Sequence, residues 1–544
     1  MDKEKLQSRF AAMKQDSSSW TAAWRDLATY ICPNRGFFSG TPNDGKTFDH
    51  RTVIDSTQTR ALRTMSAGMT SGLTSPSRPW FKLGIADEEL MNKQAVSIWL
   101  ATVQERMMSV FSKSNIYGAL YSMYEEIGTF GTAAMVLLED YEDVIRARNF
   151  TVGEYFLSTN SKGLANSFAR EYYKTVDQMV EEFGYDNCSE STRTNYDQKN
   201  FNVWVKVNNL IEPSREYSEG NPLKKAYNSY YWEEGVSTDK LLLESGFNEF
   251  PVLAPRWSVT TTSDIYGRGP SWDCLGDVKM LQKLQKNKLL GLDKTVNPPV
   301  QVDSSVIGEP NLLPGGVTRA SATVPNVGVR STYQVAVDLS AIEMTIRESQ
   351  AAINSTFYKD LFMMISQNNS PTMTAREVVE RHEEKLLMLG PVLEKLESEL
   401  LDPLIGRTFN IMNRVGLIPQ PPEELQGMEM KVDYVSVLAQ AQKMVGTTAI
   451  EQVTRFVMNF AGVNPTVLDV LNPDATATEY ARLVGVSPKI IRSPEEIQQL
   501  REARAEAQAA AQQAPDLNAA IQGAKNLSET RLDNNSALSA LLGR

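Results

Sequence analysis

The stretch SDIYGRGPSWDCLGDVKMLQKLQKNKLLGLDKTVNPP, residues 263–299, decides the fold of this chain. Gly267 and Gly269 allow a sharp turn, and Pro270 suits the first turn of a helix because its missing N–H would have no partner there. The sequence therefore predicts a helix from Pro270 to about Asp293, with its leucines spread over one broad arc. The Gly-Arg-Gly turn is too short to form a nucleotide site.

Three lysines form a narrow stripe on this helix, namely Lys279, Lys283 and Lys286. They share a face because residues three and four positions apart are neighbours on a helix surface. Two interpretations stay open at this point. The stripe is either an ordinary solvated face or a row of ammonium groups that meets a polyanion.

A segment rich in proline, glycine and valine follows at residues 295–339 and predicts short strands and turns. After it, apolar residues recur at helical spacing over residues 340–365, which predicts a second long helix. Two helices would thus flank a compact β insertion, as a stalk that carries a small head.

A polar loop, SQNNSPTMT at residues 366–374, leads into a helical pattern of unusual length over residues 374–414. Gly390 and Pro391 lie near the middle of that pattern. A proline there removes one i→i−4 hydrogen bond and clashes with the preceding turn, so we expect a kink. Asp402-Pro403 predicts a second bend.

The composition limits the classes of function. At 544 residues the chain is too long for one core, and it has no run of apolar residues long enough to cross a membrane. Three separated cysteines and two histidines argue against a zinc module and against Ser-His-Asp catalysis. A net charge of −11 argues against a protein that grips DNA over its whole surface. We therefore expect no catalytic residue, no metal, no cofactor and no membrane contact.

The octet GTPNDGKT at residues 40–47 matches the phosphate-binding loop of many ATPases. A true loop of this kind follows a buried strand and opens a helix, whereas this octet follows a helix end and precedes a strand-like run. Pro42 removes a donor, and Asp44 would place a negative charge beside the phosphates. MVLLED at residues 135–140 resembles a magnesium-binding strand but is as easily a buried strand that leads to a turn. We favour a surface loop and keep an ATPase as the alternative.

The N-terminal half predicts a mixed α+β region. Residues 4–31 carry apolar side chains at helical steps, with Ser17–Ser19 as a break, so we expect a pair of helices. Short strand patterns fill residues 130–260. Further helical patterns cover residues 59–73, 92–128 and 175–184.

Three motifs, in register along the chain, resemble the portal, or head-to-tail connector, proteins of short-tailed tailed bacteriophages (podovirus type). They are DGKTFDHRTVIDSTQTRALRTMSAGMTSGLTSPSRPWFKL (44–83), YGRGPSWDCLGDVKMLQKL (266–284) and PTMTAREVVERHEEKLLMLGPVLEKLESELLDPLI (371–405). The resemblance covers about residues 1–430. It places Gly45, Lys46 and Thr47 in a segment that such portals carry without any nucleotide role, and it implies a protein that is not an enzyme.

The resemblance implies an α+β, mainly α-helical portal fold that assembles into a ring. The implied parts, in chain order, are a wing (1–262), stem helix 1 (263–294), a β-rich clip (295–340), stem helix 2 (341–366), a tunnel loop (367–374), a kinked helix with more of the wing (375–430), an α-helical crown (431–492) and a C-terminal helix with a flexible tail (493–544). The C-terminal helix would either join a barrel in the ring or stand alone.

The resemblance also implies a function. The ring, typically a dodecamer, would sit at one vertex of the virion capsid after assembly in the host cytoplasm. Double-stranded DNA would be packaged, retained and ejected through its channel. The implied partners are the terminase large subunit, a tail adaptor or nozzle, the major capsid protein, and scaffold or internal core proteins. A capsid or tail adaptor without a DNA channel stays as an alternative.

The tunnel loop would narrow this channel with uncharged side chains: Gln367, Asn368, Asn369, Ser370, Pro371, Thr372 and Met373. Amides and hydroxyls can exchange weak hydrogen bonds with phosphates, and a methionine can slide along a varying surface. Such shallow sites suit a channel, because base-specific contacts would stall the DNA. A plain connection between two helices is the alternative.

Overall fold

The structure, a computed structural model, describes residues 3–38, 53–85, 87, 90, 93–215, 217, 225–236, 240–321, 328–332, 338–366, 389–425, 430–434, 453–459, 471–484, 496–508, 522 and 525. The chain is a mixed α/β protein and mainly helical. It divides into two compact units, which comprise residues 1–82, 103–419 and 432–448, and residues 83–102, 420–431 and 449–544.

The helices and strands alternate in blocks along the chain. The helices are α1 (Lys3–Tyr30), α2 (Thr57–Leu73), α4 (Gln94–Lys113), α5 (Ile116–Phe130), α6 (Val176–Phe183), α7 (Glu190–Asp197), α8 (Pro270–Val296), α9 (Leu339–Thr356), α10 (Lys359–Ser366), α12 (Asp402–Arg414) and α14 (Pro473–Val484). The strands are β1 (Phe81–Ile85), β2 (Ala134–Asp140), β3 (Val144–Phe150), β4 (Tyr155–Thr159), β5 (Ala165–Thr175), β6 (Trp204–Pro213), β7 (Tyr227–Glu233), β8 (Leu243–Phe247), β9 (Val252–Leu253), β10 (Val300–Val302), β11 (Val329–Ser331) and β12 (Met430–Tyr434).

The strands of the first unit form antiparallel sheets, as expected for short strands joined by turns. The largest sheet has five strands in the order β4-β5-β6-β7-β8, so it is a simple meander. A second sheet has the order β3-β2-β9, in which β2 and β3 form a hairpin with Ala134 opposite Phe150 and Asp140 opposite Val144. Strands β10 and β11 form a separate small ladder.

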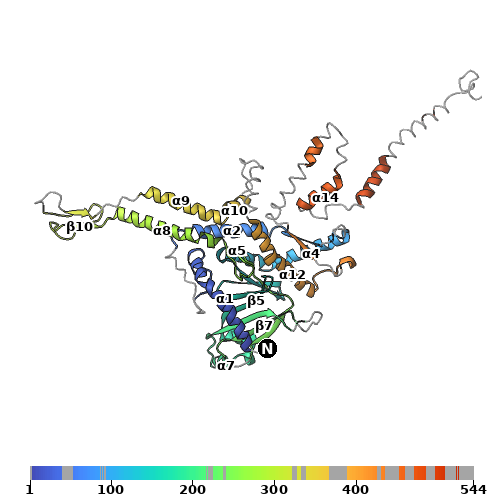
Figure 1. The fold of residues 1–544 in the computed structure, drawn as a ribbon, viewed down its shortest axis with the longest axis horizontal. Coiled ribbons are helices and arrows are strands. Elements are labelled where there is room, and N and C mark those ends of the chain that lie inside the picture. Colours follow the sequence, from blue (N-terminus) through green and yellow to red (C-terminus); the bar gives the residue numbers. More distant parts are fainter. Residues whose placement is uncertain are drawn as a thin grey trace, which may run out of the picture. The chain divides into compact units, whose positions relative to one another are not determined.

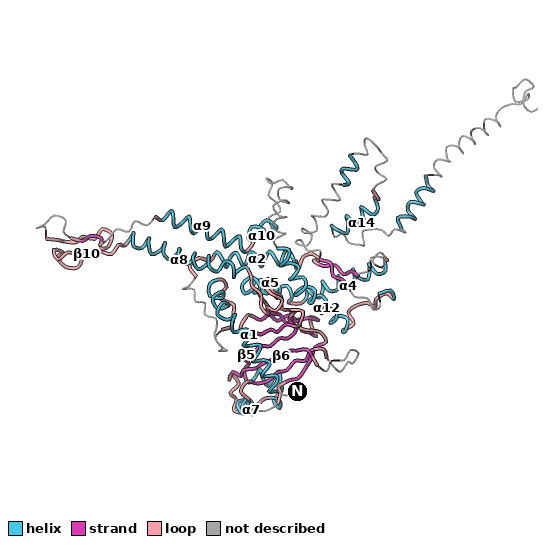
Figure 2. Tube along the Cα trace, in the orientation of Figure 1, coloured by secondary structure: helices cyan, strands magenta, loops and turns pink. Residues whose placement is uncertain are grey.

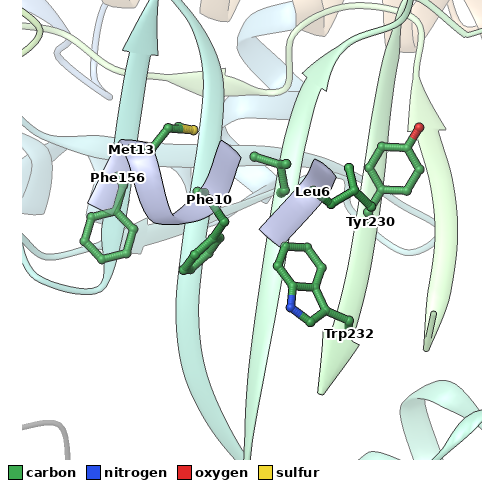
Figure 3. Packing of buried hydrophobic residues seen from close by; sticks show 8 residues of the cluster. Leu6, Phe10, Met13, Phe156, Tyr230 and Trp232 are labelled. Carbon is green, nitrogen blue, oxygen red and sulfur yellow. The ribbon is translucent and has the colours of Figure 1, made fainter. Parts of the chain in front are cut away.

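Helix α1 covers one face of the five-stranded sheet (Figure 3). Leu6, Phe10 and Met13 lie three and four residues apart and therefore share one helix face. The Phe10 ring meets the rings of Phe156 and Trp232 edge-on, with centroids 5.7 and 5.6 Å apart. These contacts bury the apolar stripe of α1 against β4 and β7.

The prediction of two N-terminal helices was wrong, because α1 is one helix from Lys3 to Tyr30. Serine hydroxyls interrupt a helix when they compete for its backbone hydrogen bonds. Here the hydroxyls bond back to carbonyls of the same helix: Ser17 donates to Lys14, and Thr21 donates to Ser17. The helix therefore continues through the Ser17–Ser19 run.

Helices α8 and α9 lie side by side, and the β10–β11 ladder lies beyond their far ends (Figures 1 and 2). The chain thus leaves the first unit along α8, turns in a small β segment and returns along α9. The sequence predicted this order of helix, strands and helix. The predicted end of the first helix, near Asp293, falls close to its observed end at Val296.

The second helix of the pair differs from the prediction of one helix over 340–365. It breaks into α9 and α10 at Phe357 and Tyr358, where Tyr358 adopts a left-handed conformation with φ of 53°. The break buries Phe357 completely and packs Phe362 against Gly68 of α2. Apolar spacing continues across the break, so periodicity alone did not reveal it.

The second unit is described in fewer segments. Residues 496–508 are helical, within the C-terminal helix that the sequence predicted. Arg501 makes two hydrogen bonds of 2.7 Å to Asp474 in the first turn of α14. An exposed pair of this kind contributes little to stability.

Candidate functional site

The body of the first unit holds the α8–α9 pair through the carboxylate of Asp55. Gln285 of α8 and Gln350 of α9 both donate to its Oδ2, at 2.9 and 2.8 Å. Thr57 donates its backbone N–H and its hydroxyl to Oδ1, at 2.8 and 2.6 Å. Gln282 bonds the backbone on both sides, since it accepts from Asp55 N–H and donates to Asp55 O. Asp55 therefore joins α2, α8 and α9.

Burial by itself would raise the pKa of Asp55, but the hydrogen bonds from Thr57, Gln350 and Gln285 outweigh it and hold that pKa below its ordinary value. The carboxylate is therefore ionised at neutral pH and accepts four hydrogen bonds. Sequence reasoning missed Asp55 as an anchor. The signal available was a polar DST segment within the 44–83 motif.

The Gly-Arg-Gly turn serves a close backbone crossing before α8. A Cβ on Gly267 would lie 2.6 Å from the carbonyl oxygen of Gly131, and one on Gly269 would lie 2.5 Å from that of Ile127. Gly131 itself has φ of 84°, a conformation that favours glycine. The start of α8 therefore packs directly on the end of α5.

Two side chains of α8 fasten this crossing. Ser271 donates its hydroxyl to Gly128 O at 2.7 Å, and Trp272 donates its indole N–H to Phe130 O at 2.9 Å. Both acceptors belong to the last turn of α5, whose carbonyls lack partners within the helix. The Gly-Arg-Gly motif is thus accounted for by packing and not by a ligand.

The three lysines of the predicted stripe have different surroundings. Lys279 forms an ion pair of 2.7 Å with Asp26 of α1 and lies over the ring of Tyr30. Lys283 and Lys286 are exposed, and neither forms an ion pair with any residue that the structure describes. The stripe is therefore divided between one lysine held by α1 and two that project from α8.

The tunnel-loop residues Gln367, Asn368, Asn369, Ser370, Pro371, Thr372 and Met373 lie outside the described residues, and so does the octet at 40–47. Gly390 and Pro391 are described and lie in a helical segment that runs from residue 389 to residue 396. The segment before them is outside the description, so the kink at Gly390-Pro391 stays a prediction.

A π-helix at Glu397–Leu401 follows this segment and leads into α12. Pro403 lacks an N–H, so one hydrogen bond of the regular α-helical ladder cannot form here. The wider turn carries Glu399 toward Arg256. The Arg256 guanidinium donates to both oxygens of Glu399, at 2.7 and 3.2 Å, and the pair is nearly fully buried.

The run at 135–140 lies in a buried strand, β2, that ends in a turn. Asp140 accepts hydrogen bonds from the backbone N–H groups of Glu142 and Asp143, at 2.8 and 3.0 Å. Glu139 forms an ion pair of 2.7 Å with Arg414. Both carboxylates thus have structural partners, as expected for a buried strand that leads to a turn.

The residues with described positions offer neither a metal centre nor a membrane span. Among them, no cluster of histidine, cysteine, aspartate or glutamate could hold a metal ion. None of the helices there is long and apolar enough to span a membrane.

Comparison with known proteins decides the family. Residues 3–491 match the family described as bacteriophage head to tail connecting protein. The chain is 40% identical to the probable portal protein of Bordetella phage BPP-1, over 99% of this chain and 97% of that one. It is 42% identical to the portal protein of Salmonella phage epsilon15, over 99% of this chain and 98% of that one. The chain belongs to the phage portal family.

As a portal protein, the chain is part of the head-to-tail connector of a phage particle. Two solved structures also align with it, the virion of a native gene transfer agent particle and the neck of an empty particle of that kind. They cover 74% and 85% of this chain at 8% and 12% identity, with TM-scores of 0.30 and 0.37. These values are too low to bear on the fold.

Proposed function

We propose that this portal protein is one subunit of a ring, a dodecamer, whose centre is a channel for double-stranded DNA. The ring occupies one capsid vertex and serves packaging, retention and ejection of the genome. It docks the terminase large subunit and later a tail adaptor or nozzle, and it contacts the major capsid protein and scaffold or core proteins. Its role is structural and not enzymatic.

The observation that supports this proposal best is the α8–α9 pair with its β segment, in a chain of the portal family. Copies of such a pair can bundle side by side and wall a tube. In this proposal α8 and α9–α10 are the stem, residues 295–340 are the clip, and the sheets with α1 belong to the wing. The crown and C-terminal helix follow residue 430.

The charge of the chain suits a conduit. Each subunit carries −11, so a ring is strongly acidic and repels phosphates over most of its surface. Lys283 and Lys286 offset this charge locally where α8 faces the channel. Lys279 contributes less, because Asp26 already neutralises it. The uncharged loop at 367–373 supplies weak contacts to the passing DNA.

Electron microscopy of the purified full-length protein tests the proposal. Rings with a central hole are the expected result, since heterologous contacts between identical subunits close into rings. Monomers would overturn the proposal. Solid discs would favour a capsid or tail adaptor without a channel.

Substitutions in the loop test its place in the channel. Asn369→Asp or Thr372→Glu should leave ring formation intact but impair packaging or DNA retention, because added negative charge repels phosphates. Packaging is measured as DNA protected from nuclease inside the capsid. Asn369→Gln is the matched control, and normal packaging in the charged variants would place the loop away from the channel.

A further inference from the structure

A cavity of about 640 Å³ opens beside the five-stranded sheet, between strands β2 and β3 and helix α6. Its walls are partly aromatic and include Phe150, Tyr172 and Tyr231. Arg148 and Arg170 line it as well. Charged and aromatic side chains thus line this pocket together, and an occupant has to match both. The portal function proposed above makes no use of this cavity.

Arg170 is the unusual residue of the pocket. Its guanidinium lies between two rings, with the central carbon 4.3 Å from the centroid of Phe150 and 4.2 Å from that of Tyr172. Its Nε is buried and has no hydrogen-bond partner. Burial lowers the pKa of Arg170, although the carboxylate of Glu154 opposes that effect from a distance. The side chain as a whole is half-buried, and no carboxylate that the structure describes forms an ion pair with it, so the site can still take up a counter-ion.

The other charges around the pocket do not supply that counter-ion. Lys174 and Glu182 form an ion pair with each other. Arg148 lies near enough to Arg170 to oppose its charge, and neither arginine forms an ion pair within the described part of the chain. Glu181 also lines the pocket and is exposed. Besides aromatic surface, the pocket therefore presents Arg148 and Arg170 as cations and Glu181 as one acid, none of them in an ion pair with a residue that the structure describes.

The turn between β2 and β3 has the opposite character. Tyr141 is fully exposed, at 111% of its reference area. Asp140 pairs with Arg146 at 3.6 Å, whereas Glu142 and Asp143 form no ion pair with the residues that the structure describes. Tyrosine is enriched among the residues that dominate interfaces, and carboxylates contribute there when a cation meets them. We call residues 140–143 the acidic turn.

The acidic turn cannot enter the pocket of its own chain. The β2–β3 hairpin is paired along its whole length, from Ala134 opposite Phe150 to Asp140 opposite Val144. Arg148 lies four residues beyond Val144 along a straight strand, about 14 Å away at the usual rise of a strand. A hairpin paired in this way cannot fold back over that distance, so the acidic turn can reach such a pocket only on a second copy of the chain.

We propose that the acidic turn of one subunit docks in this pocket on the next subunit. Tyr141 packs on the aromatic wall, and the carboxylates of Glu142 and Asp143 meet Arg148 and Arg170. The inference rests on the proposed ring, in which each subunit gives one such contact and receives one. An interface of this head-to-tail kind is what a closed ring requires.

A charge exchange tests this docking on the purified full-length chain. Glu142→Arg and Arg148→Glu are the single variants; both sites are exposed, so neither change disturbs the core. Each should raise the protein concentration at which half of the chains are in rings by tenfold or more, since like charges then face each other. The double variant should recover most of the loss. Glu244→Arg, an exposed acid on β8, is the matched control.

The outcomes separate this inference from the proposed function. Rings of the wild-type chain and weak rings of both single variants, restored by the exchange, support the docking. Single variants that assemble at the wild-type concentration, or an exchange that restores nothing, overturn the docking and leave the ring in place. Absence of rings in the wild-type chain overturns both.

Discussion

The two halves of the α8–α9 pair differ in what covers their apolar side chains. Near the body of the unit, Val278 and Leu281 of α8 and Ile353 of α9 are buried completely. Toward the β10–β11 ladder the pair exposes Leu289, Val296 and Met344, at 55%, 66% and 65% of their reference areas. The near half is completed by its own chain. The far half exposes apolar surface of the kind that interfaces cover, which suits its place in the proposed ring.

Truncating one leucine in each half compares the two halves directly, and the buried leucine should give the largest loss of stability. Leu281→Ala should lower the free energy of unfolding by about 3 to 4 kcal/mol, because it leaves a cavity in a filled core. Leu289→Ala should lower it by less than about 0.5 kcal/mol in the isolated subunit, because the side chain is exposed. Calorimetry of unassembled protein makes the comparison. Equal losses in the two variants would contradict the difference between the halves.

The ion pair of Arg256 and Glu399 lies at the base of the near half. Glu399→Ala should cost about 3 kcal/mol, because it leaves a buried guanidinium without its anion. The loss is at the low end for such a pair, since Arg256 still donates to the carbonyls of Asp264 and Gly163. Thermal unfolding measures the change. Glu394 is an exposed acid on the preceding helix, so Glu394→Ala should change the unfolding temperature little. An equal loss in both variants would show that the Arg256–Glu399 pair contributes nothing specific to stability.

Asp55 should come next in size. Asp55→Ala leaves the side-chain amides of Gln285 and Gln350 without their acceptor, which costs about 2 kcal/mol. The near half of the α8–α9 pair should then separate from the start of α2 more often. Limited proteolysis should cut between Ile54 and Thr57 faster than in the wild-type chain, with Asp293→Ala on α8 as the exposed control. Unchanged proteolysis would show that α8 and α9 are held without this carboxylate.

The smallest effect is a dependence of this loss on pH. The folded-state pKa of Asp55 is lowered, so its contribution is complete above the unfolded pKa, near 4, and is lost as pH falls through the folded pKa. The difference in stability between wild type and Asp55→Ala should therefore be constant from pH 7 to pH 5 and shrink below about pH 4. The titration of the other acidic groups affects both proteins equally, so it cancels in this difference. If this difference in stability grew on acidification, the pKa of Asp55 would have to be raised by folding and not lowered.

The sequence predicted the helix–strand–helix order because regular spacing of apolar residues and a proline at the first turn are local signals. It did not predict the break at Tyr358, since the apolar spacing continues across it and the cause is the burial of Phe357. The same limit applies to the two halves of the pair. Leu281 and Leu289 look alike in the sequence, and only the burial of the near half, where α1 and α5 contact α8, separates them.

The candidate site was predicted in part. Motif resemblance identified the family, and the comparisons confirmed it. The lysine stripe followed from spacing, but spacing could not show that Asp26, more than two hundred residues away, pairs with Lys279. Asp55 and the π-helix that brings Glu399 to Arg256 depend on contacts between distant segments. The residue pattern of a single helix does not indicate such contacts.

The crossing of Gly131, Gly267 and Gly269 constrains how relatives of this chain can diverge. Each glycine leaves room that another backbone segment occupies, so an added methyl group at one of them cannot be relieved by trimming a side chain elsewhere. None of the three glycines can therefore be replaced by a residue with a Cβ while the crossing keeps this geometry. Sequence changes in this protein must therefore occur outside the crossing of α5 and the start of α8. Insertions or reporter tags should be placed in surface turns far from that crossing.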